Sequence, residues 1–184
     1  MEKEHINGRR LLPSLVFCYI GGSLIGLVLE GIWTTLYYGK WESHVVSMWL
    51  PLCILYGMGI ASFFAVGTLL HEKPVWMQFL MVALVCDLLE LISGELLYSV
   101  LGMRAWDYTD SIFHYKGIVS LEMTVVWGVL GTLFIKFAFP PLNRLFDRIR
   151  IERFFVLSVI LAIWMAGDLV FTSICMVRWS ERHR

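Results

Sequence analysis

Six acidic residues fall within the apolar stretches of this sequence, where a charged side chain is costly. They are Glu30, Asp87, Glu90, Glu95, Glu122 and Asp168. The one clear basic residue in such a stretch is Lys136. A charge at the middle of a bilayer costs at least about 2.5–3.5 kcal/mol on insertion scales. We therefore expect these acids to be protonated, exposed to water or paired with an external cation, and the chemistry they offer is proton exchange or cation binding.

The spacing of three of these acids indicates how they are arranged on their helices. Asp87 and Glu90 are three residues apart and share a helix face. Two carboxylates that close repel, so one of them holds a proton or both contact a cation. Glu30 follows Gly22 and Gly26 at four-residue steps, and such a small-residue face lets a neighbouring helix approach closely.

The segment "WDYTDSIFHY", residues 106–115, is unlike the apolar runs on either side of it. Trp106 and Tyr108, together with Tyr56 from an earlier span, suit an organic cation, because aromatic faces attract positive charge. The same rings are typical anchors at the membrane interface. Asp107 is able to cap a helical turn, so the sequence predicts an ordered outer cap, and a structural role for it is as well supported as ligand contact.

Composition and hydropathy define the elements that must position these groups. The 184 residues are 58% hydrophobic, and the mean hydropathy is +0.71. A spanning helix needs about 20 mostly apolar residues. We predict an all-α, polytopic integral membrane helical bundle with the ordered aromatic and acidic loop between its third and fourth helices. Its single membrane domain, 1–184, has five transmembrane helices at about 14–36, 45–70, 75–100, 117–139 and 154–177. Pro74 and the Pro140–Pro141 pair lie at predicted helix ends, since proline does not continue a helix cheaply.

Charge and cysteine usage exclude several classes of partner. Fifteen basic and fifteen acidic residues balance, and no basic stretch is long enough to neutralise several phosphates, so we expect no nucleic-acid partner. The cysteines lack the short spacings of a zinc or redox pair, so we expect no metal and no cofactor.

The distribution of lysine and arginine predicts the orientation in the membrane. One side would carry Lys3, Arg9, Arg10, Lys73, Arg144, Arg148, Arg150 and Arg153. The other side would carry Lys40, Arg104, Lys116, Arg178, Arg182 and Arg184. The excess favours a cytoplasmic amino terminus, which places residues 106–115 and most of the buried acids toward the outer leaflet.

The order of several motifs resembles one bacterial family. "GLVLEGIWTTLYYGKWESH", "WLPLCILYGMG", "LLELISGELLYSVLGMRAWDYTDSIFHYKGIVSL" and "WGVLGTLFIKFAFPPL" follow one another as in the family labelled "putative ABC-transporter permease, type IV", or CmpB-like. The resemblance covers roughly residues 20–145. The matching positions are Glu30, Pro51, Tyr56, Gly57, Gly59, Glu90, Gly94, Trp106, Asp107, Tyr108, Gly117, Trp127 and Gly128.

Three positions depart from the pattern of that family. Thr109 stands where serine is usual, and His114 stands where asparagine is expected. Leu55 replaces the Pro-Ile that leads into Tyr-Gly in that family. If the asparagine position binds a ligand, His114 would make that contact dependent on pH. The sequence contains no G-x-x-x-x-G-K-S/T phosphate loop, so any ATP hydrolysis would belong to a separate subunit.

These observations favour a small bacterial transport component in the cell membrane, permease-like, with an acidic and aromatic outward cavity. Its ligand would be a cation, a proton-coupled solute or a lipid-like amphiphile. The predicted ligand-binding residues are Glu30, Asp87, Glu90, Glu122, Tyr56, Trp106, Asp107, Tyr108 and His114. Besides the lipid bilayer, the expected partners are a second copy of the chain or a separate membrane or ATPase subunit.

Two alternatives from other classes remain open. One is an intramembrane enzyme acting on a lipid or polyprenyl substrate, with Asp107, His114 or Glu122 as acid–base groups. No Ser-His-Asp or His-Glu-x-x-His pattern accompanies them, so no catalytic residue is assigned. The other is a non-catalytic assembly subunit whose acids bind a partner helix.

Overall fold

The computed structural model describes residues 8–41, 49–50, 52–102, 104 and 106–182, and these residues are almost entirely helical. Lys3, residues 42–48, Pro51 and Arg184 lie outside them. The helices are α1 (Gly8–Tyr38), α2 (Ile54–Leu70), α3 (Val75–Leu101), α4 (Leu121–Leu133), the π-helical turn η1 (Phe134–Ala138), α5 (Phe139–Arg148), the 3-10 turn η2 (Ile151–Phe154) and α6 (Phe155–Arg182). A short hairpin, β1 (His114–Tyr115) and β2 (Val119–Ser120), precedes α4.

Four helical segments within the described residues are long and apolar enough to cross a membrane. They are Gly8–Tyr37, Val75–Val100, Leu121–Arg148 and Ile151–Cys175. The chain is therefore a multi-pass, all-α membrane protein, as the sequence predicts. The second predicted span, 45–70, is helical only over the 17 residues of α2 among those described. Its length of about 26 Å is short of the roughly 30 Å hydrocarbon core, and Leu52 and Cys53 lead into it as buried, non-helical chain.

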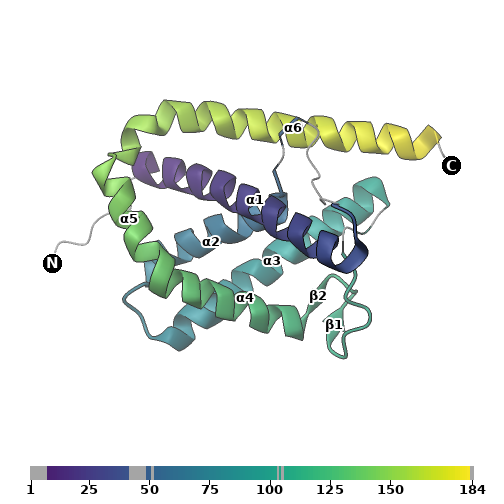
Figure 1. Cartoon of the computed structure of the whole chain (residues 1–184), viewed down its shortest axis with the longest axis horizontal. Coiled ribbons are helices and arrows are strands. Elements are labelled where there is room, and N and C mark those ends of the chain that lie inside the picture. Colours follow the sequence, from purple (N-terminus) through teal and green to yellow (C-terminus); the bar gives the residue numbers. More distant parts are fainter. Residues whose placement is uncertain (1–7, 42–48, 51, 103, 105, 183–184) are drawn as a thin grey trace.

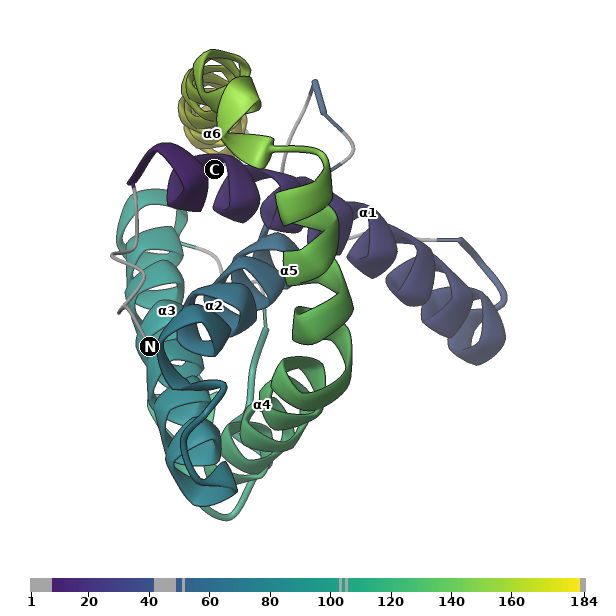
Figure 2. The ribbon, with the colours of Figure 1, turned by 90° about the vertical axis from the view of Figure 1, so that its left-hand side faces the viewer.

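The helices pack as a bundle with α6 laid along its side. Figure 1 shows α2, α3 and α4 below α1, and α6 above α1, with the start of α1 and the end of α6 at opposite ends of the molecule. Figure 2 shows the same layers from the side, with α5 joining α4 to the start of α6. Two apolar clusters fill the bundle: Phe63, Val66, Val82, Cys86, Trp127 and Ile135 form one, and Cys18, Phe64, Phe139, Phe146 and Ile151 form the other.

Small residues bring α1 and α2 into close contact. A methyl group added at Gly26 would overlap the Tyr56 ring, and one added at Gly22 would overlap the Ile60 side chain. The glycine-lined face predicted from the sequence is thus the face that receives α2. This packing sets Glu30, one further turn along α1, beside the start of α2.

The fourth membrane helix continues past its predicted end at residue 139. Pro140 and Pro141 follow Phe139 in the first turn of α5, directly after a π-helical turn. The turn before them, Phe134–Ala138, is π-helical, and this wider turn allows the helix to proceed to Arg148. The expectation that the prolines end the helix was wrong for this reason.

Polar contacts hold the continued helix to the beginning of α1. Arg10 donates to Asn143 at 2.9 Å and forms an ion pair with Asp147 at 2.5 Å. Both partners lie on α5, beyond the prolines. These bonds fix the end of the bundle where the chain turns through η2 into α6.

The connection from α3 to α4 is a compact loop that ends in the hairpin. Gly102 closes α3 in the left-handed conformation, with φ +64°. His114 pairs with Ser120, and Tyr115 with Val119. Ser120 then caps α4 by accepting a hydrogen bond from the backbone N–H of Met123.

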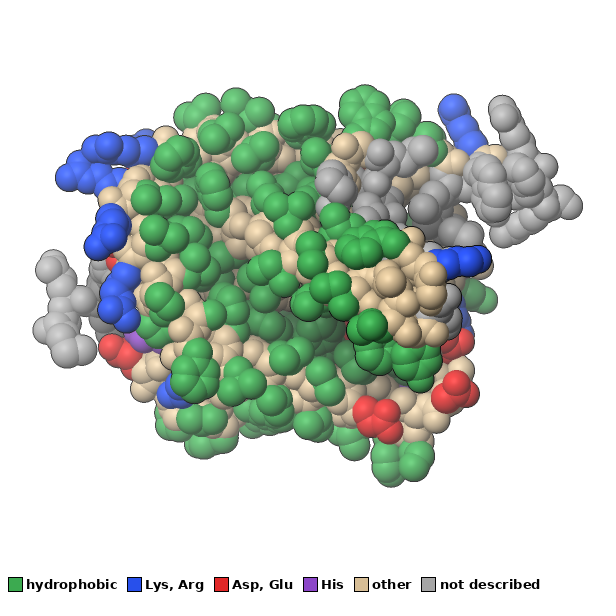
Figure 3. Space-filling view, viewed as in Figure 1, with side chains coloured by type: hydrophobic (Ala, Val, Ile, Leu, Met, Phe, Trp, Pro, Cys, Tyr) green, Lys and Arg blue, Asp and Glu red, His purple; other side chains and the backbone are tan. Residues whose placement is uncertain are grey.

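The surface is divided between apolar side chains and charged ends. Figure 3 shows hydrophobic side chains over most of one face, basic side chains at the end where α5 meets α6, and acidic side chains near the hairpin. The basic end carries the exposed residues Arg9, Arg144, Arg148, Arg150 and Arg153. Most apolar side chains of α6 are also exposed, including Val156, Ile163 and Val170, as expected of a helix that faces lipid.

Candidate functional site

Glu90, in the middle of α3, is the most enclosed of the membrane acids. Its side chain is only 1% exposed. One carboxylate oxygen, Oε1, accepts a hydrogen bond from the indole Nε1 of Trp127 on α4 at 2.8 Å and one from the Tyr108 hydroxyl at 3.2 Å. The carboxyl group is thus held by a second membrane helix and by the loop that follows α3.

The other oxygen of Glu90 has no such partner among the described residues. Oε2 is buried and makes no hydrogen bond there. Glu90 lines a void of about 10 Å³, together with Leu55, Met58 and Cys86. A space of that size holds about one water molecule. A buried carboxylate oxygen without a donor is costly, so the void suits a proton on the carboxyl group or one small polar species.

Asp87 lies one helical turn before Glu90 but has a partner of its own. The Thr124 hydroxyl of α4 lies 2.9 Å from Oδ2 and 3.1 Å from Oδ1 of Asp87. The two acids share a helix face, as their spacing predicts, yet each contacts a different residue of α4. Thr124 was not among the residues singled out in the sequence.

Glu30 occupies a separate position at the contact of α1 with α2. The Cys53 thiol donates to its Oε2 at 3.6 Å. Tyr56 lies near Glu30 and near Tyr108, whose hydroxyl binds Glu90. Tyr56 therefore lies between the surroundings of the two acids, and the void beside Glu90 is not lined by Glu30.

The Trp-Asp-Tyr segment is tied down largely by bonds within its own loop. Trp106 donates its indole N–H to the carbonyl of Ile118 at 2.8 Å. Asp107 accepts from the Thr109 backbone N–H at 3.0 Å and from Arg104 at 3.1 Å. These bonds, the Thr109 N–H first, hold the pKa of Asp107 below its ordinary value. Asp107 thus organises a turn of the loop.

Tyr108 is the residue of that segment that reaches into the bundle. Burial, and then the neighbouring charge of Glu90, raise the pKa of Tyr108 above its ordinary value. Its phenol therefore stays protonated and remains a hydrogen-bond donor to Glu90 over a wide pH range. The cap and the buried acid are joined at this point.

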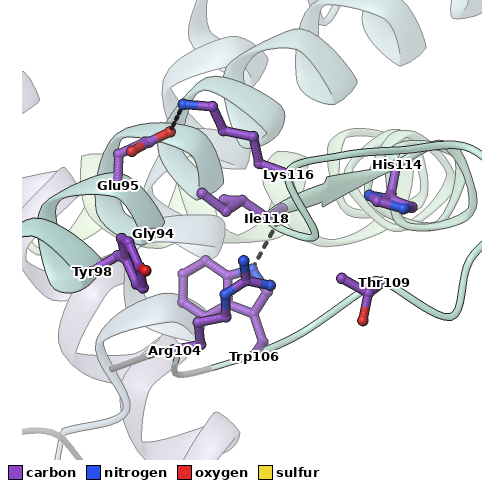
Figure 4. A pocket seen from close by; sticks show the side chains of 9 residues that line it. All are labelled: Gly94, Glu95, Tyr98, Arg104, Trp106, Thr109, His114, Lys116 and Ile118. Atoms are coloured by element: carbon purple, nitrogen blue, oxygen red, sulfur yellow. Dashed lines mark hydrogen bonds and ion pairs between the residues drawn. The ribbon is translucent and has the colours of Figure 1, made fainter. Parts of the chain in front are cut away.

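A larger hollow, about 420 Å³, lies at the C-terminal end of α3, beside Trp106. Figure 4 shows Trp106 and Ile118 at its centre, Arg104 and Tyr98 on one side and His114 on the other. Of the predicted site residues, only Trp106 and His114 line it. Its one lining carboxylate, Glu95, forms an ion pair with Lys116 at 2.5 Å, so this hollow carries both signs of charge.

The remaining acids and His114 have local partners. Glu122, exposed in the first turn of α4, accepts from the Ser111 hydroxyl at 3.2 Å. The Nδ1 atom of His114 accepts from the Gly117 backbone N–H at 3.0 Å. Asp168 of α6 is buried and accepts from the backbone N–H groups of Trp49 and Leu50, which anchors the chain before α2.

Trp127 is the main contact of Glu90 that was not selected as a site residue from the sequence. It entered there only as a position shared with a resembling family. A tryptophan within a membrane span still needs an acceptor for its N–H when it is buried. That requirement was a usable signal, because Glu90 is the acceptor that satisfies it.

Comparison with protein families gives one match. The model of the family described as "Putative ABC-transporter type IV" matches residues 17–173. The matched range begins within α1 and ends within α6, so it contains Glu30, Glu90, Tyr108 and Trp127. Searches of curated proteins and of solved structures give no match.

Proposed function

The chain belongs to the family described as "Putative ABC-transporter type IV", and from this premise we propose that it is a membrane transport component in which Glu90 carries a proton. The observation that supports the proposal is the buried Glu90 carboxyl group, which has two neutral donors on one oxygen and none on the other among the described residues. The proton would move on and off Glu90 as a solute crosses the cell membrane.

The energetics of burial favour a proton over an organic cation at this position. A charged carboxylate deep in a membrane protein needs a positive partner, and the contacts of Glu90 come from an indole and a phenol. The adjoining void, about 10 Å³, accepts one water but not an organic cation. A neutral Glu90 carboxyl group that exchanges its proton through that water fits both the uncharged contacts and the small void.

The neighbouring residues would control the exchange. Tyr108 joins Glu90 to the loop after α3, and Tyr56 lies near both Tyr108 and Glu30. In this proposal a displacement of the loop removes one donor from Glu90 and opens the carboxyl group to water. Asp87, held by Thr124, adds a second acid one turn away.

The same proposal includes an orientation and a partner. Exposed arginines, among them Arg144, Arg148 and Arg153, gather where α5 meets α6. Excess basic charge marks the cytoplasmic side, so the amino terminus would be cytoplasmic and the loop over Glu90 would face outward. A separate ATPase subunit, a second membrane subunit or a second copy of this chain would complete the transporter.

Proton movement in membrane vesicles tests the role of Glu90. Vesicles prepared from the producing cells keep any partner subunit and would contain a trapped pH-sensitive dye. We expect an imposed membrane potential to change the internal pH faster with the wild-type chain than without it, and Glu90→Gln to abolish the difference. The matched control is Glu72→Gln, which alters an exposed acid after α2.

A second measurement separates loss of the proton site from loss of folding. Infrared spectra of the purified protein should contain a protonated-carboxyl band that is absent from a folded Glu90→Gln variant. Proton movement that persists in Glu90→Gln, or identical carboxyl bands in the two proteins, would reject the proposal.

A further inference from the structure

We propose that the outer hollow at the end of α3 binds the phosphate group of an amphiphile such as a phospholipid. This site is distinct from the Glu90 void, because the two are lined by different residues. The inference does not depend on proton transfer at Glu90. It follows from the donors that the hollow presents and from its place beside an apolar helix face.

Arg104 supplies the first group of donors. One guanidinium nitrogen, Nη1, is held 3.1 Å from Asp107, and the guanidinium carbon lies 5.8 Å from the centre of the Tyr98 ring. These contacts orient the side chain without using all five of its N–H groups. The planar guanidinium can therefore bind two phosphate oxygens at once, a geometry in which arginine exceeds lysine.

His114 and Lys116 add donors from the hairpin. Because Nδ1 of His114 accepts the Gly117 N–H, the ring proton of the neutral side chain lies on Nε2, which is then a donor. Lys116 uses one ammonium hydrogen for Glu95 and has two more. The hydrogen bond to Glu95, and then the charge of Glu95, raise the pKa of Lys116, so the ammonium remains charged. Arg104 and Lys116 are each paired with one carboxylate, Asp107 and Glu95, but the N–H groups that those contacts leave unused, with Nε2 of His114, remain as donors around the hollow.

The apolar part of the hollow suits the remainder of an amphiphile. The indole N–H of Trp106 is satisfied by Ile118, so the ring offers an apolar face. Along α3, Glu95 is followed toward the membrane interior by Leu91, Leu88 and Leu84 at steps of three or four residues, which places them on one side of the helix. Leu88 and Leu84 are exposed. An acyl chain lying on this stripe would have its phosphate at the level of the hollow.

Native mass spectrometry of the detergent-purified chain tests this site. The probe is phosphatidylglycerol, compared with diacylglycerol of the same acyl chains and with soluble glycerol phosphate. We expect phosphatidylglycerol to remain bound and the other two to bind far more weakly. Arg104→Gln should weaken phosphatidylglycerol binding about tenfold, since charge-assisted hydrogen bonds are lost, and His114→Gln should weaken it less.

Arg148→Gln is the matched control, because Arg148 is an exposed arginine at the opposite end of the bundle. Equal binding by Arg104→Gln and Arg148→Gln would overturn the proposal, as would diacylglycerol or glycerol phosphate binding as tightly as the phospholipid. If Arg104→Gln does not fold, His114→Gln is compared with the control by the same criterion. Proton movement through Glu90 is measured separately, so failure of one proposal leaves the other testable.

Discussion

Glu90 and Glu95 lie little more than one turn apart on α3, and the molecule stabilises them in opposite ways. Glu90 is buried and contacts an indole and a phenol. Glu95 is partly exposed at the end of the same helix and forms an ion pair with Lys116. The inner acid is thus buried among neutral partners, and the outer acid is partly exposed beside a charged partner.

The difference shows what each position permits. An exposed ion pair is solvated and screened, so it is cheap to form and contributes little. A buried acid without a base is stabilised mainly by hydrogen bonds, and its stability changes strongly when it loses or gains one proton. The inner position is therefore suited to proton exchange, whereas the outer position is suited to a charged head group.

The largest expected effect comes from removing the inner acid. Glu90→Ala leaves the N–H of Trp127 and the hydroxyl of Tyr108 without their acceptor, and should lower the free energy of unfolding by about 2–4 kcal/mol. Unfolding in a detergent series measures the loss. Glu95→Ala, the outer counterpart, should cost much less; equal losses would remove the distinction between the two acids.

Gly94→Ala should affect both regions at once. A methyl group at Gly94 would overlap the side chain of Ile118 and would touch the ring of Trp106, so the loop at Ile118 must shift. Overpacking of this kind costs about 1–3 kcal/mol, and phosphatidylglycerol binding should weaken with it. Gly167→Ala is the control, since no atom lies near a methyl group at that position. Wild-type stability and lipid binding in Gly94→Ala would contradict the close packing of loop and helix.

Tyr108→Phe should have a moderate effect that grows clearer with pH. The lost hydrogen bond is worth about 0.5–1.5 kcal/mol. Because the folded-state pKa of Tyr108 is raised, its contribution to stability is fully present below its ordinary value near 10 and is lost as the pH rises through the folded value. Unfolding measured from pH 8 to 11 should show a smaller alkaline loss in Tyr108→Phe than in the wild type. Parallel pH profiles would mean that Tyr108 is not buried against Glu90.

The smallest effect is expected at the outer ion pair. Lys116→Gln should leave the unfolding midpoint unchanged at moderate salt, because an exposed pair is screened. A midpoint that falls markedly, and equally at low and high salt, would indicate that this pair is buried in the membrane protein after all. The hollow would then be part of the core.

The sequence was sufficient to predict the helical class and the approximate extent of α3, because long apolar runs determine both. It also predicted the face of α1 that receives α2, since Gly22 and Gly26 repeat at the helical period. The end of the fourth helix was predicted wrongly. Pro140–Pro141 usually mark an end, and only the preceding π-helical turn lets the helix continue.

The partners of the acids were beyond the reach of sequence reasoning. Glu90 and Trp127 are 37 positions apart, and their contact depends on how α3 and α4 rotate against each other. Asp168 accepts hydrogen bonds from backbone N–H groups far away in the sequence. Residue types do not predict a contact to the backbone. Periodicity gives the face of each helix, but the pairing of faces is decided by packing across the whole bundle.

The π-helical turn at Phe134–Ala138 also sets the rotational phase of everything that follows it. A turn of this kind holds one residue more than an α-helical turn, so the helix beyond it is rotated by about 100° relative to an uninterrupted one. Asn143 and Asp147 face Arg10 because of that offset. Deleting one residue from this turn would remove the offset and turn both partners away from Arg10. The length of this turn therefore holds the start of α1 against α5.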